Sequence, residues 1–221
     1  MRINKFVAQA TGMSRRAADQ AIAEGRVLVD GTVPSAGDSV DTQSVVTIDG
    51  AQIFAQDQVT TIALNKPEGY VCSRNGQGSK TVYDLLPKEL HHLKSVGRLD
   101  KDSSGLLLMT SDGDLANKLT HPRYEKTKVY EITLNVPLQP LHRQMIQDTG
   151  IKVEGYVSRF SVERITDSDD INWRVTLSEG KNRQIRKTFE ALDYKVVKLH
   201  RSNFGPYTLG QLPLGKFKEI L

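Results

Sequence analysis

The apolar residues near the start of the chain recur at helical spacing. Ile3 and Val7 lie four residues apart and are followed by further apolar positions, which is the pattern of an amphipathic helix. Gly12 interrupts that pattern, and Ser14 is a suitable N-cap for a second helix over residues 15–24. The opening segment therefore predicts a pair of short helices.

Strands follow this helix pair. Residues 27–29 are apolar and run into the turn signal Asp30-Gly31, and residues 45–48 supply a return strand. The apolar pattern weakens between residues 49 and 58, which we interpret as the end of the first unit and a linker. We therefore predict two domains, residues 1–58 and residues 59–221.

The second segment predicts more strands than helices. Because its strands adjoin by hairpins as often as by crossovers, we expect an α+β domain with a mainly antiparallel mixed sheet flanked by helices. A turn is expected at residues 66–69 and an edge element in the tail, residues 206–221. The strands are expected at residues 61–65, 70–73, 106–110, 128–134, 151–153, 157–165, 173–177 and 194–200, and the helices at residues 81–86, 112–120, 140–147 and 182–192.

Composition sets outer limits on the class of protein. The 221 residues are 38% hydrophobic, which is enough for a packed core. No apolar run approaches the length that crosses a bilayer, and the N-terminus lacks the apolar segment of a signal peptide, so we expect a cytoplasmic protein without a membrane partner. Cys72 is the single cysteine, which excludes an internal disulfide and a thiolate-rich zinc site.

Basic residues concentrate at the N-terminus, although the net charge is only +4. Arg15 and Arg16 lie at a helix start, where positive charge opposes the helix dipole, and this favours a binding role for them. The segments MRINKF, SRRAA and GRVLVDG resemble the S4 RNA-binding domain. That resemblance implies phosphate contacts that position an RNA without reading its sequence. The candidate RNA-binding residues of this unit are Arg2, Lys5, Arg15, Arg16 and Arg26.

Four carboxylates flank the predicted strand at residues 106–110. Asp112 and Asp114 follow a strand of about 17 Å and so lie at its far end from Asp100, which argues against one shared metal site. Both also fall in the first turn of a helix, where acids cap the backbone and complement the dipole, with Ser111 or Asp112 as the N-cap. Asp100 instead precedes the strand in a glycine-bracketed loop, and Asp102 has no evident task.

Five segments, in this order along the chain, resemble one enzyme family. GRLDKDSSGLLLMT at residues 97–110 resembles the signature of the RsuA/RluB/RluE/RluF family of ribosomal RNA pseudouridine synthases. The resemblance covers most of residues 60–221, behind an S4 domain that many members carry. The other segments are LNKPEG at 64–69, KTKVY at 126–130, EGKNRQIRK at 179–187 and LHRSNFG at 199–205.

The resemblance implies roles for particular residues. It makes Asp100 the catalytic aspartate, Tyr130 the aromatic residue against the flipped uracil, and Arg186 the basic partner of Asp100. Arg98 and Leu199 would support the pocket. The chain departs from the family pattern at two positions, with Ser103 where Thr is usual and Lys187 where Arg is common.

The implied reaction breaks the C1′–N1 bond of a uridine, turns the base and joins C5 to C1′. It needs no cofactor and no metal. A carboxylate can attack the sugar or the base, or stabilise positive charge at C1′, and the sequence does not choose between these roles. The target nucleotide must leave its stack, and Lys181, Arg183 and Lys187 can hold the surrounding phosphates.

The sequence thus predicts a monomeric enzyme that isomerises a specific uridine in ribosomal RNA, free or within a pre-ribosomal particle. The segment 180–186 resembles family members that act on large-subunit RNA more than those that act on the small subunit, which implies the large subunit as the target. One alternative is a non-catalytic S4-type RNA-binding or ribosome-assembly protein, which does not need Asp100. Another is a metal-dependent phosphohydrolase that uses the Asp cluster, which predicts dependence on divalent ions.

Overall fold

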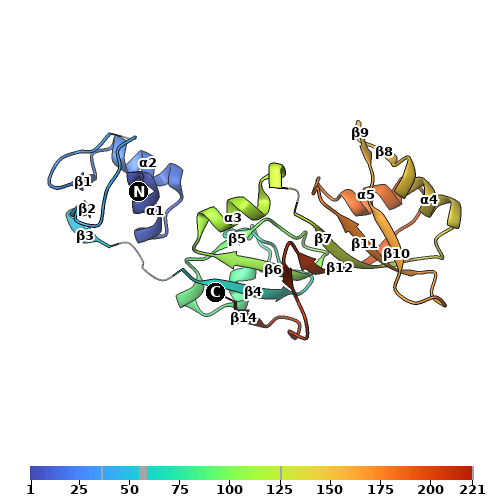
Figure 1. The fold of residues 1–221 in the computed structure, drawn as a ribbon. Coiled ribbons are helices and arrows are strands. Elements are labelled where there is room, and N and C mark those ends of the chain that lie inside the picture. Colours follow the sequence, from blue (N-terminus) through green and yellow to red (C-terminus); the bar gives the residue numbers. More distant parts are fainter. Residues whose placement is uncertain (36, 55–58, 125, 221) are drawn as a thin grey trace. The chain divides into compact units, whose positions relative to one another are not determined.

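The computed structural model describes residues 1–35, 37–54, 59–124 and 126–220 (Figure 1). These residues divide into two compact units, Met1–Val59 and Thr60–Leu221, each with its own hydrophobic core. Residues 55–58 of the predicted linker and residue 221 of the predicted tail lie outside the described residues.

The first unit combines two helices with a three-stranded antiparallel sheet. The predicted helix pair is confirmed, and the side chain of Ser14 caps the second helix by accepting a hydrogen bond from the Ala17 backbone N–H. The predicted strands are confirmed, and the sheet gains a third strand. The elements are α1 (Ile3–Thr11), α2 (Arg15–Ala23), β1 (Val27–Val29), β2 (Val46–Ile48) and β3 (Ala51–Ile53), with strand order β1-β2-β3.

The second unit is built on a nine-stranded sheet. Seven strands follow the path β10-β11-β7-β12-β6-β4-β14, β5 pairs with β6, and β13 pairs with β12. β8 and β9 form a separate hairpin. The strands are β4 (Thr61–Lys66), β5 (Lys94–Val96), β6 (Ser104–Thr110), β7 (Lys128–Leu134), β8 (Ile151–Val153), β9 (Tyr156–Ser158), β10 (Ser161–Arg164), β11 (Asn172–Leu177), β12 (Val196–Phe204), β13 (Tyr207–Thr208) and β14 (Phe217–Glu219).

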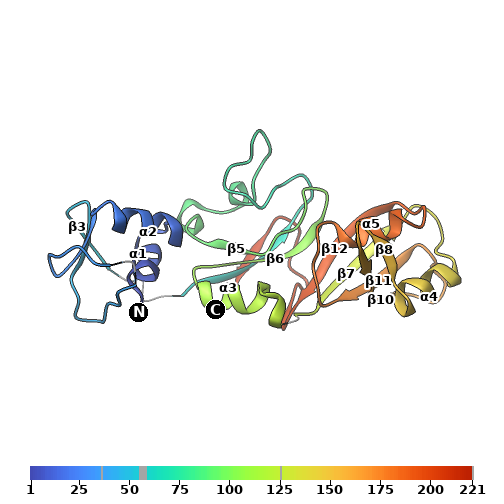
Figure 2. The same ribbon diagram turned by 90° about the horizontal axis from the view of Figure 1, so that it is seen from above.

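The helices of this unit lie near different parts of the sheet. α3 lies beside β5 and β6, whereas α4, α5 and the β8–β9 hairpin gather over the part formed by β7, β10 and β11 (Figure 1, Figure 2). The predicted α+β architecture is confirmed, and β12 with β6 is the one parallel pairing among the described strands. The helices are α3 (Gly113–Thr120), α4 (Pro140–Asp148) and α5 (Gln184–Glu190), with three short 3-10 helices at Val82–Leu85, Lys88–Leu90 and Pro122–Tyr124.

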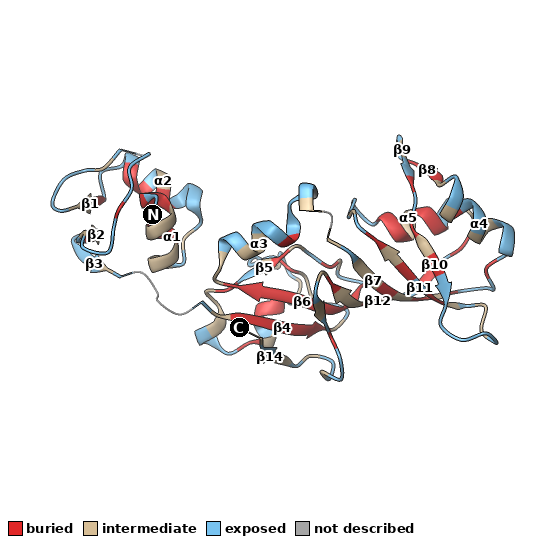
Figure 3. Cartoon of the chain, viewed as in Figure 1, coloured by how far each residue is buried: buried red, intermediate tan, exposed pale blue. Residues whose placement is uncertain are grey.

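Strand β6 changes partner along its length. One edge pairs with β4 throughout, while the other edge pairs with β12 at residues 104–105 and with β5 at residues 108–110. Both β4 and β6 are buried along their whole length (Figure 3). The loop between β5 and β6 carries Asp100. It therefore leads into the end of β6 that pairs with β12, and β6 is a fully buried strand.

Gly105 sets how closely β6 can approach β12. Its φ is +106°, and a Cβ at this position would lie 2.3 Å from the Arg201 carbonyl oxygen and 2.5 Å from the Arg201 backbone nitrogen. Gly105→Ala is therefore expected to lower the free energy of unfolding by about 2–3 kcal/mol, through positive-φ strain and separation of the two strands. Urea denaturation measures this loss. Gly113→Ala is the control, because a Cβ there meets no atom within 4 Å.

Two strand predictions in the second unit are wrong, and one strand is missing from the prediction. Residues 70–73 form no strand and make only an isolated bridge from Val71 to Thr81. The strand predicted at 157–165 is two strands, β9 and β10, because the chain leaves one hairpin and enters the main sheet there. The three-residue strand β5 is absent from the prediction, since so short a segment has little alternation to detect. No helix in the described ranges has the length and apolar character needed to cross a membrane.

Candidate active site

The loop that carries Asp100 is clamped by the last residue of β4, Lys66. Lys66 was predicted to begin a turn, but it is the last residue of β4 and is fully buried. Its ammonium donates hydrogen bonds to the carbonyl oxygens of Asp100 (2.9 Å), Ser103 (2.7 Å) and Pro67 (3.1 Å). Burial lowers the pKa of Lys66, because desolvation disfavours its charged form. The three carbonyl dipoles offset part of that cost and fix both ends of the turn at residues 100–103.

Cys72 holds the same loop from the other side. Its thiol donates to the Leu99 carbonyl at 3.3 Å, and the Leu99 N–H donates to the sulfur at 3.4 Å. The backbone N–H of Gly69 adds a 2.7 Å bond to the Lys101 carbonyl. Burial raises the pKa of the Cys72 thiol, so the side chain packs as a neutral group. The loop around Asp100 is thus fixed at three successive residues.

Two carboxylates share the guanidinium of Arg183. Asp102 accepts two hydrogen bonds of 2.9 Å from its terminal nitrogens, and an oxygen of Asp100 lies 3.6 Å from one of them. Arg183 reaches the loop because it is the N-cap of α5, with φ 51°. The Arg183 hydrogen bonds lower the pKa of Asp102. All three side chains are partly exposed, with Asp100 at 36%.

Arg186 is predicted as the basic partner of Asp100, but it contacts Asp102 instead. Its side chain is 12% exposed. The guanidinium donates to the carbonyls of Asp102 and Val196, and its Nε lies 3.3 Å from the Asp102 carboxylate. Those carbonyls fix its position, so Arg183 is the arginine that the described structure places beside Asp100.

Tyr130 and Leu199 are buried in the core of the second unit. Tyr130 alternates inward on β7 and is 9% exposed, and Leu199 on β12 is 6% exposed. Both belong to one buried cluster with Leu99, Cys72 and Ile185. Leu99, the residue before Asp100, therefore packs in the same cluster as Tyr130.

Arg98 does not join this group. It is exposed, and within the described residues no ion pair joins it to Asp100. The two acids at the far end of β6 are also separate, and Asp112 caps α3 by accepting a 2.8 Å hydrogen bond from the Asp114 N–H, as predicted.

No cluster of three or more His, Cys, Asp or Glu side chains suited to a metal ion occurs in the described ranges.

The basic residues around α5 already have partners within the protein. Lys181 lies 3.2 Å from Glu179 and 3.8 Å from the ring centre of Tyr156. Lys187 bonds to Glu154 at 2.7 Å. Phosphate contacts from these lysines would require an exchange of partners.

The predicted RNA-binding residues of the first unit differ in how firmly contacts within the protein hold their side chains. Arg26 is held by two short hydrogen bonds to Asp49, whereas Arg15 makes one long bond to Asn4. Arg2 and Arg16 are exposed, and neither forms an ion pair with a described residue. α2 thus presents two adjacent, accessible guanidinium groups.

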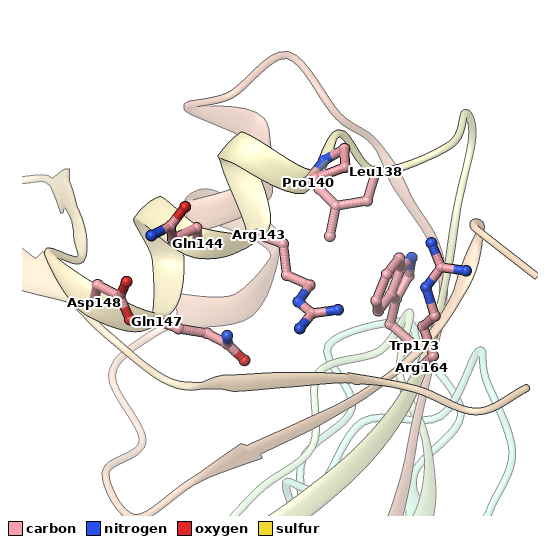
Figure 4. A pocket seen from close by; sticks show the side chains of 8 residues that line it. All are labelled: Leu138, Pro140, Arg143, Gln144, Gln147, Asp148, Arg164 and Trp173. Carbon is pink, nitrogen blue, oxygen red and sulfur yellow. The ribbon is translucent and has the colours of Figure 1, made fainter. Parts of the chain in front are cut away.

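The site contains two residues without a predicted task, Lys66 and Asp102. The sequence signal for Lys66 is its place at the end of an apolar run, directly before Pro67. For Asp102 there is no signal beyond its charge. A cavity of about 310 Å³ lies elsewhere, between α4 and the strands β10 and β11, with Arg143 and Trp173 on its wall (Figure 4). None of the predicted site residues lines it.

Comparisons with known proteins match both units. The family model for RNA pseudouridylate synthase matches residues 60–191, and the model for the S4 domain matches residues 1–46. A solved structure described as a pseudouridylate synthase superposes with a TM-score of 0.71 at 30% identity, over 100% of this chain and 96% of that one.

Curated relatives carry names for both ribosomal subunits. The chain is 34% identical to ribosomal large subunit pseudouridine synthase B of Pseudomonas aeruginosa, over 99% of this chain and 59% of the relative. It is also 34% identical to ribosomal small subunit pseudouridine synthase A of Salmonella typhimurium, over 100% of this chain and 96% of the relative. It thus spans little more than half the length of the first of these relatives. The chain belongs to the RNA pseudouridylate synthase family and carries an S4 domain at its N-terminus.

Proposed function

We propose that this protein isomerises a specific uridine of ribosomal RNA to pseudouridine, with Asp100 as the catalytic carboxylate. The observation that carries the proposal is the clamped loop, which fixes Asp100 beside the Arg183 cation in a chain of this family. The relatives named for ribosomal subunits support ribosomal RNA as the substrate. We favour the large subunit on the sequence of residues 180–186.

The arrangement suits both roles that a carboxylate can take in this reaction. Attack on the nucleotide and stabilisation of positive charge at C1′ each require an ionised group in a fixed position. Lys66 and Cys72 fix the loop, and Arg183 supplies a counter-charge 3.6 Å away. The new C5–C1′ bond replaces the C1′–N1 bond. The C5 proton is released to water, and N1, now free of the sugar, takes up a proton from water, so the product is an isomer of uridine.

Tyr130 provides the aromatic surface in this proposal. A uridine in a stack cannot be reached, so it must be extruded, and a flipped base gains stacking energy on an aromatic ring. The ring is 9% exposed and belongs to the same buried cluster as Leu99, the residue before Asp100, with Leu199 on the neighbouring strand. Stacking on this ring therefore requires that its face become accessible when the RNA binds.

Tritium release tests the proposal. The purified protein is incubated with large-subunit and small-subunit RNA labelled with tritium at uracil C5, as free RNA and as immature particles, with EDTA present. Release from a large-subunit substrate is expected. Release from small-subunit RNA alone would contradict the subunit preference, and absence of release from every substrate would contradict the enzyme and favour the non-catalytic RNA-binding alternative.

The N-terminal unit should contribute affinity that depends on salt. Removing both guanidinium groups by Arg15→Ala with Arg16→Ala should weaken RNA binding about tenfold and reduce the slope of log K against log salt by roughly 2, because two phosphate contacts disappear. Filter binding at several salt concentrations measures both quantities. Lys195→Ala, an exposed cation of the second unit, is the control. An unchanged slope in the double variant would exclude these residues from the RNA interface.

A further inference from the structure

Asp102 lies at the centre of an ordered chain of contacts. Arg186 is anchored by the Val196 carbonyl and by the Asp102 backbone, and the Asp102 carboxylate then receives both terminal nitrogens of Arg183 at 2.9 Å. The outer end of the chain is the 3.6 Å contact of Arg183 with Asp100. Arg186 has the least exposed side chain of these four residues, at 12%.

We infer that Asp102 is a positioning residue that acts on Asp100 through Arg183, an inference that rests on the proposed function. A guanidinium binds a carboxylate most strongly through two parallel hydrogen bonds. Asp102 occupies that paired geometry, so Arg183 reaches Asp100 with one nitrogen only. Asp100 thus has a cation nearby while its carboxylate is not held in a two-point ion pair.

Loss of the Asp102 charge changes this arrangement. Arg183 is 39% exposed, and among the described residues Asp100 and Asp102 are the carboxylates within ion-pair distance of its guanidinium, with Glu190 acting from further away. In an Asp102→Asn variant, Arg183 either turns to solvent or forms the two-point pair with Asp100. The first removes the cation from Asp100, and the second occupies the carboxylate oxygens that the reaction needs. Both outcomes slow the chemical step and leave RNA binding unchanged.

A competing role for Arg183 is contact with an RNA phosphate. In that case Asp102 competes with the phosphate for the guanidinium, and its neutralisation strengthens RNA binding. The two roles therefore predict different changes in separate quantities, namely the rate at saturating protein and the dissociation constant.

A double-mutant cycle tests the inference in the full-length protein. Single-turnover rates of tritium release at saturating protein, and dissociation constants for the same RNA, are measured for Asp102→Asn, Arg183→Gln and the double variant. Each single variant should be roughly tenfold slower, within the range for a misplaced group at a reacting centre. The double variant should also be roughly tenfold slower, because all three variants lose the same pairing of Asp102 with Arg183. The dissociation constants should stay within about threefold of wild type.

Two variants sharpen the cycle. Asp102→Glu retains a charge that can hold both nitrogens of Arg183, and it should recover most of the rate. Glu154→Gln is the matched control, because it breaks the ion pair of Lys187 on the same helix without touching Asp102, and its rate should equal wild type. Should Asp102→Asn fail to fold, as judged by its melting curve, the rate of Arg183→Gln at saturating protein decides instead.

Several results would overturn the inference. These are a wild-type rate for Asp102→Asn or Arg183→Gln, a double variant slowed by the product of the two single effects, or tighter RNA binding by Asp102→Asn at an unchanged rate. A wild-type protein that releases no tritium contradicts the proposed function itself, whereas a fully active Asp102→Asn contradicts only the positioning role.

Discussion

Asp100→Asn is expected to reduce pseudouridine formation by at least about 10³-fold, since loss of a reacting carboxylate removes most of the rate. Asn keeps the shape of the side chain but can neither attack the nucleotide nor stabilise positive charge at C1′. The loop should persist, because Lys66 and Cys72 bind its backbone and not the Asp100 side chain. Single-turnover tritium release measures the rate, and thermal unfolding confirms that the variant is folded.

Asp112→Asn is the matched control for this variant. Asp112 is a carboxylate at the opposite end of β6, and it acts as the N-cap of α3. Asn caps helices as well as Asp does, so this variant should retain the wild-type rate. Equal losses in the two variants, or an active folded Asp100→Asn, would remove Asp100 from the reaction.

Lys66→Met is expected to lower the free energy of unfolding by about 1–3 kcal/mol, the range for buried polar groups that lose a hydrogen-bond partner. Met fills a similar volume but donates no hydrogen bond, so the carbonyls of Asp100, Ser103 and Pro67 lose a shared donor inside the protein. Activity should fall as well in conditions where the variant is folded, because Asp100 follows this turn.

Urea denaturation measures the stability of this variant against Lys101→Met. Lys101 is exposed, and its ammonium bonds to Ser79 on the surface, so its replacement should change the stability by less than about 0.5 kcal/mol. A loss for Lys66→Met as small as that of the control would mean that the buried ammonium does not hold the loop.

Much of the fold follows from local patterns in the sequence. From Tyr130 to Leu134 apolar and polar residues alternate, and residues 128–134 form β7 with the predicted bounds. The N-caps Ser14 and Asp112 are confirmed. These features depend on residues that are neighbours in the chain, and local physical rules cover them.

The parts of the site that escape prediction depend on distant contacts. The sequence predicts Lys66 in a turn because a charged side chain is rarely buried. Its burial is possible because its ammonium binds the carbonyls of Asp100 and Ser103, which are distant in sequence, as well as that of Pro67. The partner of Asp100 depends on where α5 begins. A helix from residue 182 would include Arg183, but α5 starts at Gln184 and leaves Arg183 in a left-handed N-cap that faces the loop.

The central claim is that Asp100 makes this protein form pseudouridine at a defined site in ribosomal RNA. Pseudouridines are mapped in the ribosomal RNA of cells that lack the protein and that receive either the wild-type gene or Asp100→Asn. The account predicts one uridine, in the large subunit, that is modified only with the wild-type gene. An identical map for both genes would contradict it.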